Sequence, residues 1–339
     1  MAAFGQQTPT APETNQPQQR QPIRPQITMP DENASSVVRQ NSRGQRIVEI
    51  PLLDCSGLPC VEMTSGSGKT LRLLIDTGDA NSYLDVKAAQ TLGLTLQALP
   101  GSGDSTASQV QQTVVPGAKL GDLPMGDFPF MVLDTTPEPN QTAQKVPPLP
   151  ADGALTYNAF QNRLLEIDFP RKLVRISEPE EAPASCPHAC SNLIRKHFGG
   201  YGPVTLTADG FTIDGQPVDS QIDTLFTGTM LVYPASLEKL GLKKQAKAKH
   251  KEFFPFTQGG LKLSRFDGAT ESFRDLPLMQ NAPIYFITAD DHPPNVSFDA
   301  TVGSGLLGQA IVSFDFKGMH MWIDAGTPPP APAGGAPQR

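Results

Sequence analysis

Leu73-Leu74-Ile75-Asp76-Thr77-Gly78 is an apolar run that leads directly into Asp-Thr-Gly. The three large aliphatic residues predict a buried strand with Asp76 held at its end, and Gly78 permits a tight backbone turn. Such an arrangement presents a carboxylate rigidly to a substrate. Because acid–base hydrolysis needs both a general base and a general acid, we expect a partner for Asp76 elsewhere in the chain or on a second subunit.

Matching segments recur in the second half of the chain. Ile222-Asp223-Thr224 lies 147 residues after Ile75-Asp76-Thr77. Residues 165–169 (Leu-Glu-Ile-Asp-Phe) are matched at the same distance by residues 312–316 (Val-Ser-Phe-Asp-Phe). The shared offset predicts an internal duplication in which Asp223 is the partner of Asp76.

At these residues the chain resembles the aspartic proteases of the pepsin and retropepsin type, over roughly residues 45–325. The resemblance implies an all-β fold of two tandem retropepsin-like β-barrel lobes with a cleft between them. It implies that Asp76 and Asp223 are the catalytic residues, one from each lobe. It also implies that Thr77, Gly78 and Thr224 support the two catalytic loops, with the threonines hydrogen-bonding across the pair.

The resemblance further implies a glycine beneath each catalytic loop, in an apolar-apolar-Gly strand. In the second lobe this residue is expected to be Gly308, within Gly-Leu-Leu-Gly at residues 305–308. In the first lobe Thr156 stands at the corresponding place. Leu225 follows Asp223-Thr224 where the family has glycine, and because leucine lacks the freedom of glycine at positive φ, we expect that loop to follow another path.

The function that the resemblance implies is aspartic endopeptidase activity, in which a water molecule activated between the two aspartates attacks a peptide bond. Two carboxylates at hydrogen-bond distance cannot easily both ionise, so the pair is expected to share a proton at mildly acidic pH. We expect no metal and no organic cofactor. The expected partner is a peptide or protein substrate, and the tandem lobes favour a monomer.

Two alternatives remain open at this point. Leu225 and Thr156 favour a catalytically impaired pepsin-fold protein that binds peptides or a protein partner. The other alternative is that two chains associate and juxtapose their Asp76 loops, as single-lobe retropepsins do.

Composition predicts the domain organisation. Residues 1–44 are rich in Gln and Pro with few apolar residues, and residues 326–339 are rich in Pro, Ala and Gly, so both tails are expected to be disordered. Between them we expect an N-terminal lobe at residues 45–178, a linker at 179–191 and a C-terminal lobe at 192–325. Within the first lobe we expect a short helix at residues 86–92 and a mobile hairpin, comparable to the flap of this family, at residues 101–115.

The four cysteines form two local pairs, Cys55 with Cys60 and Cys186 with Cys190. Four cysteines allow three connectivities, of which we favour two short-loop disulfides. Disulfides imply an oxidising compartment, and so a secreted or periplasmic protein whose signal peptide is absent from this sequence. A zinc site made from all four cysteines is the rival interpretation.

Charge and hydropathy exclude two classes of partner. The net charge of −7 does not indicate a basic surface of the kind that binds nucleic acid, so nucleic acid is not expected as a partner. The longest apolar runs are shorter than a membrane span. The 34 prolines and 30 glycines suit a turn-rich β protein better than a helical one.

Overall fold

The computed structural model describes residues 36–40, 46–99, 111–135, 147–177, 190–197, 204–255, 260–287 and 296–325, which all belong to one compact unit. The predicted flap lies largely outside the described residues, as do the C-terminal tail and almost all of the predicted linker. Of the tail predicted to be disordered, Val37–Gln40 forms strand β1. That part of the prediction is wrong because the backbone of these residues pairs with strand β2.

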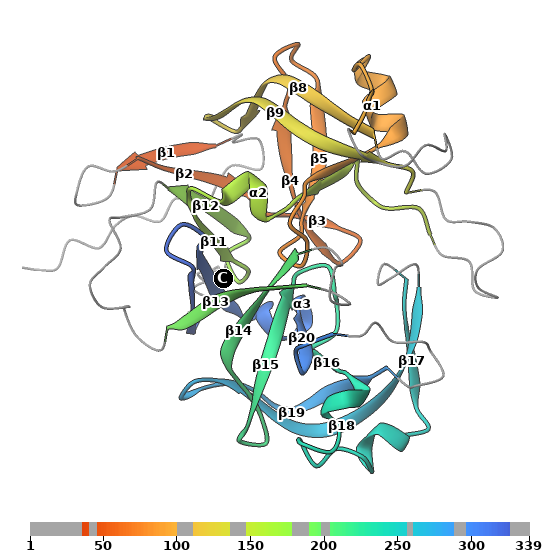
Figure 1. The fold of residues 1–339 in the computed structure, drawn as a ribbon. Coiled ribbons are helices and arrows are strands. Elements are labelled where there is room, and N and C mark those ends of the chain that lie inside the picture. Colours follow the sequence, from red (N-terminus) through yellow and green to blue (C-terminus); the bar gives the residue numbers. More distant parts are fainter. Residues whose placement is uncertain are drawn as a thin grey trace, which may run out of the picture. The chain divides into compact units, whose positions relative to one another are not determined.

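The fold is all-β, and the first half of the chain contains a closed six-stranded barrel (Figure 1). Its strands, in order around the ring, are β4 (Leu58–Thr64), β5 (Thr70–Ile75), β10 (Gly153–Leu155), β6 (Tyr83–Asp85), β9 (Leu123–Leu133) and β8 (Gln111–Leu120). The ring closes because β8 pairs back with β4. Two short strands, β3 (Leu53–Cys55) and β7 (Gln97–Ala98), extend it at either end.

The second half of the chain repeats this ring. Its strands, in the same cyclic order, are β14 (Val204–Ile213), β15 (Gln216–Asp223), β20 (Ala300–Gly303), β16 (Met230–Val232), β19 (Leu276–Phe286) and β18 (Leu261–Phe273). Pairing of β14 with β18 closes the ring, and β17 (Lys251–Phe254) lies at its edge. In both rings the apolar side chains that point inward form the core.

A further set of strands connects the two halves. In order they are β2 (Arg46–Pro51), β12 (Leu173–Ser177), β11 (Leu164–Asp168), β21 (Ala310–Asp315), β22 (His320–Ala325) and β13 (Ser191–His197). At the centre β11 pairs antiparallel with β21, and Glu166 lies opposite Ser313, the residue 147 positions later. Each half therefore contributes three strands in a register that is symmetrical about this pair.

Helices are few and short. Helix α1 (Val86–Leu92) confirms the predicted helix: the Asp85 side chain accepts a hydrogen bond from the Lys87 amide, and Gly93 ends the helix in the left-handed conformation. The others among the described residues are α2 (Tyr157–Phe160), α3 (Ser304–Leu307) and the 3-10 turns η1 (Pro234–Ser236) and η2 (Gln245–Lys247). None of the helices in the described ranges is long and apolar enough to cross a membrane.

Cys55 and Cys60 form a disulfide that closes the hairpin between β3 and β4. Cys190 is disulfide-bonded as well, whereas Cys186 lies outside the described residues. The alternative of a zinc site made from four thiolates is therefore wrong, because sulfur atoms bonded to each other are not available as thiolate ligands.

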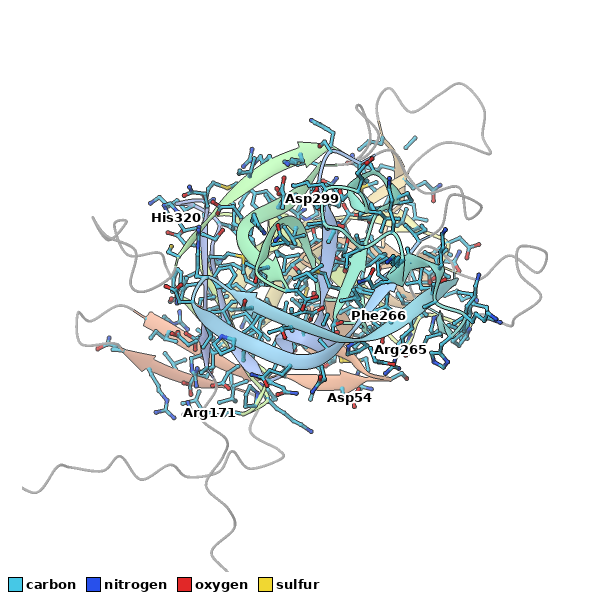
Figure 2. The ribbon with its side chains drawn as sticks, turned by 90° about the horizontal axis from the view of Figure 1, so that it is seen from below. Asp54, Arg171, Arg265, Phe266, Asp299 and His320 are labelled. Atoms are coloured by element: carbon cyan, nitrogen blue, oxygen red, sulfur yellow. A yellow bond between two sulfur atoms is a disulfide. The ribbon has the colours of Figure 1, made fainter. Side chains whose placement is uncertain are left out.

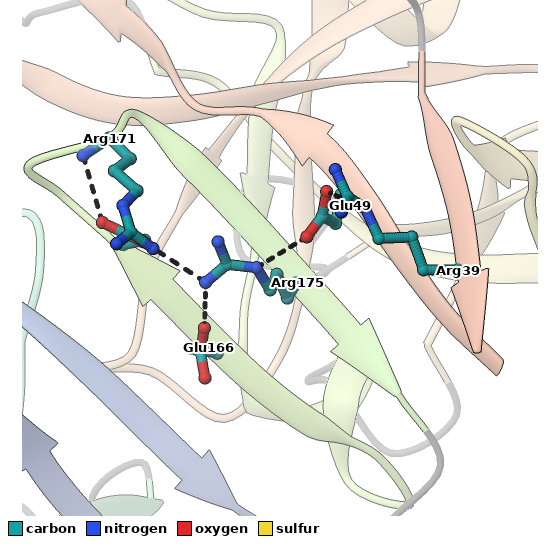
Figure 3. A network of polar contacts seen from close by, with 6 residues as sticks. Arg39, Glu49, Glu166, Arg171 and Arg175 are labelled. Atoms are coloured by element: carbon teal, nitrogen blue, oxygen red, sulfur yellow. Dashed lines mark hydrogen bonds and ion pairs between the residues drawn. The ribbon is translucent and has the colours of Figure 1, made fainter. Parts of the chain in front are cut away.

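Charged side chains tie the strands of the first half of the connecting sheet together (Figure 3). The Arg175 guanidinium on β12 donates to Glu49 on β2 at 2.8 Å and to Asp168 on β11 at 3.2 Å, and it also contacts Glu166. The Asp168 side chain is fully buried. Because an unpaired buried carboxylate is costly, the contacts of Asp168 with both Arg175 and Arg171 allow it to be buried.

In the second barrel, hydrogen bonds also hold the buried carboxylate of Asp299, which is labelled in Figure 2. Its carboxylate accepts hydrogen bonds from the Ser236 hydroxyl at 2.7 Å, from the Lys239 ammonium group at 2.5 Å and from the Asp219 amide at 3.0 Å. These contacts hold the start of β20 against β15 and η1. They fix the strand that runs beside Asp223.

Glu271 on β18 lies inside the second barrel with no exposed surface. Its register partners are Ile213 on β14 and Met279 on β19, and neither carboxyl oxygen has a hydrogen-bond partner in the described part of the chain. Burial raises the pKa of Glu271 to about 8, with a smaller contribution from the charge of Asp214. The nearby Thr229 hydroxyl, which donates to the Pro283 carbonyl, acts in the opposite direction and lowers that pKa.

This burial makes folding stability pH-dependent. Above pH 4.5 the carboxyl of Glu271 ionises freely in the unfolded chain but stays protonated in the fold until about pH 8. The folded state binds more protons in this window, so the free energy of unfolding should fall as pH rises, on the order of 1 kcal/mol per pH unit. Urea denaturation at several pH values measures this slope. It should be shallower by about this amount in Glu271→Gln, and an equal slope in both proteins would contradict the assignment.

Candidate active site

The two predicted aspartates lie at equivalent places in the two barrels. Asp76 follows β5, which runs parallel to β10, and Asp223 ends β15, which runs parallel to β20. Both line one cleft of about 380 Å³ that is formed by residues of both halves. The structure therefore brings together the two residues that the sequence singled out.

Thr77 and Thr224 join the two loops. The Thr77 amide donates to the Thr224 hydroxyl oxygen at 3.2 Å, and the Thr224 amide donates to the Thr77 hydroxyl oxygen at 3.3 Å. Each hydroxyl then donates to a carbonyl of the other half, Thr77 to Ile222 at 2.9 Å and Thr224 to Ile75. Both threonines are buried, so these four bonds satisfy groups that water does not reach.

The two aspartates are held by equivalent hydrogen bonds from the backbone. Asp76 Oδ1 accepts from the Gly78 amide at 2.9 Å, and Asp223 Oδ1 accepts from the Leu225 amide at 2.8 Å. Neither Gly78 nor Leu225 has a positive φ. The expectation that Leu225 forces its loop onto another path is therefore wrong, because this loop does not use the left-handed conformation at that position.

Gly78 is needed for space. A Cβ atom at this position would lie 2.8 Å from Cγ of Asp223, which is closer than any real contact. The Asp223 carboxyl group thus packs directly against the backbone beside Asp76. Any side chain at position 78 would push the two carboxyl groups apart.

The supporting glycine of the second half is Gly303. A Cβ there would lie 2.2 Å from the Phe226 carbonyl oxygen, so the strand passes directly beneath the Asp223 loop. The prediction for Gly308 is wrong: residues 304–307 form helix α3, and Gly308 is its C-cap. Thr156 lies 147 positions before Gly303, and each residue is the N-cap of the helix after its strand.

Burial and nearby negative charges raise the pKa values of both aspartates. Asp76 is 8% exposed, and its pKa is raised first by burial and then by the charges of Asp223 and Asp79. Burial raises the pKa of Asp223 to about 6, against the lowering effect of the Leu225 and Phe226 amides that bond to it. The arrangement therefore favours one proton on the pair near neutral pH.

Other residues of the cleft were missed at the sequence level. Asp79 directly follows Asp-Thr-Gly, and its charge acts on both aspartates. Tyr83 from the first half and Tyr233 from the second half also line the cleft, as does Gln221, which lies two residues before Asp223. The sequence did contain a signal for Gln221, because the first half has the apolar Leu74 at the equivalent position of an otherwise similar strand.

Across the described residues, no group of three or more acidic, histidine or cysteine side chains could hold a metal ion.

A comparison with known protein families supports the first half of this site. No curated protein matches the chain. Residues 61–157 match the family described as aspartyl protease. The matched segment contains the Asp76 loop and strand β10 beside it, and ends before Asp223. The match supports an aspartic protease family for the part of the chain that holds the Asp76 loop.

Proposed function

We propose that the protein is an aspartic endopeptidase in which Asp76 and Asp223 together activate the attacking water. The observation that carries the proposal is the convergence of the two carboxyl groups on one cleft, where the bonds between Thr77 and Thr224 hold their loops together. The substrate is an extended peptide or a protein segment that lies in the cleft.

The environments of the two carboxyl groups assign different roles to them. Backbone N–H groups favour the charged form of both carboxyl groups, so the difference between the two lies in burial. Asp223 is only partly buried, which penalises its charged form less, so Asp223 is the general base that takes a proton from water. Asp76 is buried, and the charge of Asp223 raises its pKa further, so Asp76 carries the shared proton. The protonated carboxyl donates to the scissile carbonyl and stabilises the oxyanion that forms.

The alternative of an impaired, peptide-binding protein is not favoured. It depended on Leu225 distorting the second loop, yet the Leu225 amide bonds to Asp223 as the Gly78 amide bonds to Asp76. Thr156 is likewise accommodated, because its amide donates to the Ser82 hydroxyl at 3.0 Å.

The proposal extends to the organisation of the chain. The shared ring order and the symmetrical pairing of Glu166 with Ser313 support an internal duplication with lobes at about residues 45–178 and 192–325. A chain that carries both aspartates functions as a monomer. The disulfides support a secreted or periplasmic location.

Removal of either carboxyl group tests the proposal. Asp76→Asn and Asp223→Asn should each lower kcat for cleavage of a peptide library by roughly 10²–10⁴-fold, the range typical of a positioned acid or base. Asp214→Asn is the matched control, since this residue lies in the hairpin turn at the other end of β15 and should retain activity. Full activity in either active-site variant, with that control intact, would refute the proposed pair.

The pH dependence of cleavage gives a second test. The rate should rise as the first carboxyl of the pair ionises and fall as the shared proton is lost. Because the pKa values of Asp76 and Asp223 are both raised, both limbs should move upward, which places the optimum of kcat/KM in the mildly acidic to neutral range. Glu271→Gln should show the same optimum, which separates this effect from pH-dependent unfolding. An optimum below about pH 4 would contradict the assignment.

A further inference from the structure

The carbonyl oxygen of Gly78 is held by two side chains of the other half of the protein. The Thr205 hydroxyl donates to it at 2.9 Å and the Gln221 amide nitrogen donates to it at 3.1 Å. The same Gln221 nitrogen donates to the Thr205 hydroxyl oxygen at 2.9 Å. Thr205 and Gln221 are only 2% and 4% exposed. A single carbonyl of the Asp76 loop thus receives two buried donors.

The side chain of Gln221 is itself fixed. Its amide oxygen accepts a hydrogen bond from the Thr301 hydroxyl at 2.8 Å, and that hydroxyl lies 3.1 Å from the Tyr233 hydroxyl. The nitrogen and the oxygen of the Gln221 amide are therefore both bonded. A buried amide with these partners has one favourable orientation, which points its nitrogen at Gly78.

The opposite loop is held in a different way. The positions 147 residues before Thr205, Gln221 and Thr301 carry apolar side chains, namely Leu58, Leu74 and Ala154. These residues form one buried cluster with the Cys55–Cys60 disulfide, and the Leu225 side chain packs against it. Leu225 corresponds to Gly78 and is anchored by apolar burial, whereas Gly78 is anchored by hydrogen bonds.

We propose that Thr205 and Gln221 are positioning residues for the Asp76 loop. This inference rests on the proposed function of the cleft and assigns new residues to it. The peptide bond after Gly78 is planar and trans, so fixing its carbonyl also fixes the Asp79 N–H on the opposite side. That N–H lowers the pKa of the Asp76 carboxyl group, and the Gly78 N–H of the same turn donates to Asp76 Oδ1 at 2.9 Å. Thr205 and Gln221 therefore orient a donor of the catalytic loop without contacting the substrate's reacting atoms.

Thr205 allows a well-matched test. Thr205→Val keeps the shape of the side chain and removes the hydroxyl, whereas Thr205→Ser keeps the hydroxyl. Thr207→Val is the control: Thr207 lies on the same strand, is fully buried, and its hydroxyl has no hydrogen-bond partner among the described residues. Loss of one buried hydrogen bond predicts about a tenfold fall in kcat for Thr205→Val with KM unchanged, near-native kinetics for Thr205→Ser, and no change for Thr207→Val.

Amide hydrogen exchange provides a readout that does not need activity. In Thr205→Val, and in Gln221→Met as a second variant, the Thr77 and Asp79 amides should exchange roughly tenfold faster than in the native protein, with Thr207→Val unchanged. Equal exchange in Thr205→Val and Thr207→Val would overturn the proposal, as would faster exchange with unaltered kcat in an active enzyme. If the native protein cleaves nothing while exchange still separates the variants, the positioning role stands and the proposed function fails.

Discussion

The hydrogen bonds exchanged by Thr77 and Thr224 are the constraint on which the site depends. Each threonine offers its hydroxyl to a carbonyl of the other half and accepts the other threonine's amide. Because these groups are buried, separating the halves without admitting water would leave several polar groups unpaired, each at a cost of about 1–3 kcal/mol. The two loops are therefore stable only together, and the aspartates that precede the threonines are brought into one cleft as a consequence.

Holding two carboxyl groups this close opposes their ionisation, and the surrounding backbone compensates only in part. Gly78 lets the Asp223 carboxyl approach, because a Cβ atom would occupy its place. Backbone N–H groups stabilise one charge on each side, yet burial still raises the pKa of both Asp76 and Asp223. A site that resists carrying two charges retains a proton, and in the proposed mechanism that proton supplies the acid which peptide hydrolysis needs.

Residues 73–78 and their counterpart 147 positions later were sufficient to predict the fold and the pair of aspartates, since a strand followed by Asp-Thr and a constant offset are both local signals. Predictions about individual glycines failed because the sequence does not show whether a glycine is needed for space or for a positive φ. Gly78 provides space rather than a positive φ, so Leu225 at the equivalent position was misread. Gly308 was selected by the similarity of a short motif, although the same offset applied to Thr156 indicates Gly303. Contacts between the halves, such as Gln221 with Gly78, depend on tertiary packing that no local pattern shows.

The contacts around the two loops explain how a nearly symmetrical fold can hold an unsymmetrical site. A shared proton must reside on one carboxyl group, and a peptide enters the cleft with a direction, so two identical aspartates would not by themselves assign acid and base. In this protein the Gly78 loop meets polar side chains, whereas the Leu225 loop meets an apolar cluster and a disulfide. Hydrogen bonds to a carbonyl are directional and fix the orientation of the adjacent N–H, while apolar burial fixes position without orienting a dipole. The two halves thus place equivalent carboxylates by different physical means, and the chain itself makes Asp76 and Asp223 chemically distinct before any substrate binds.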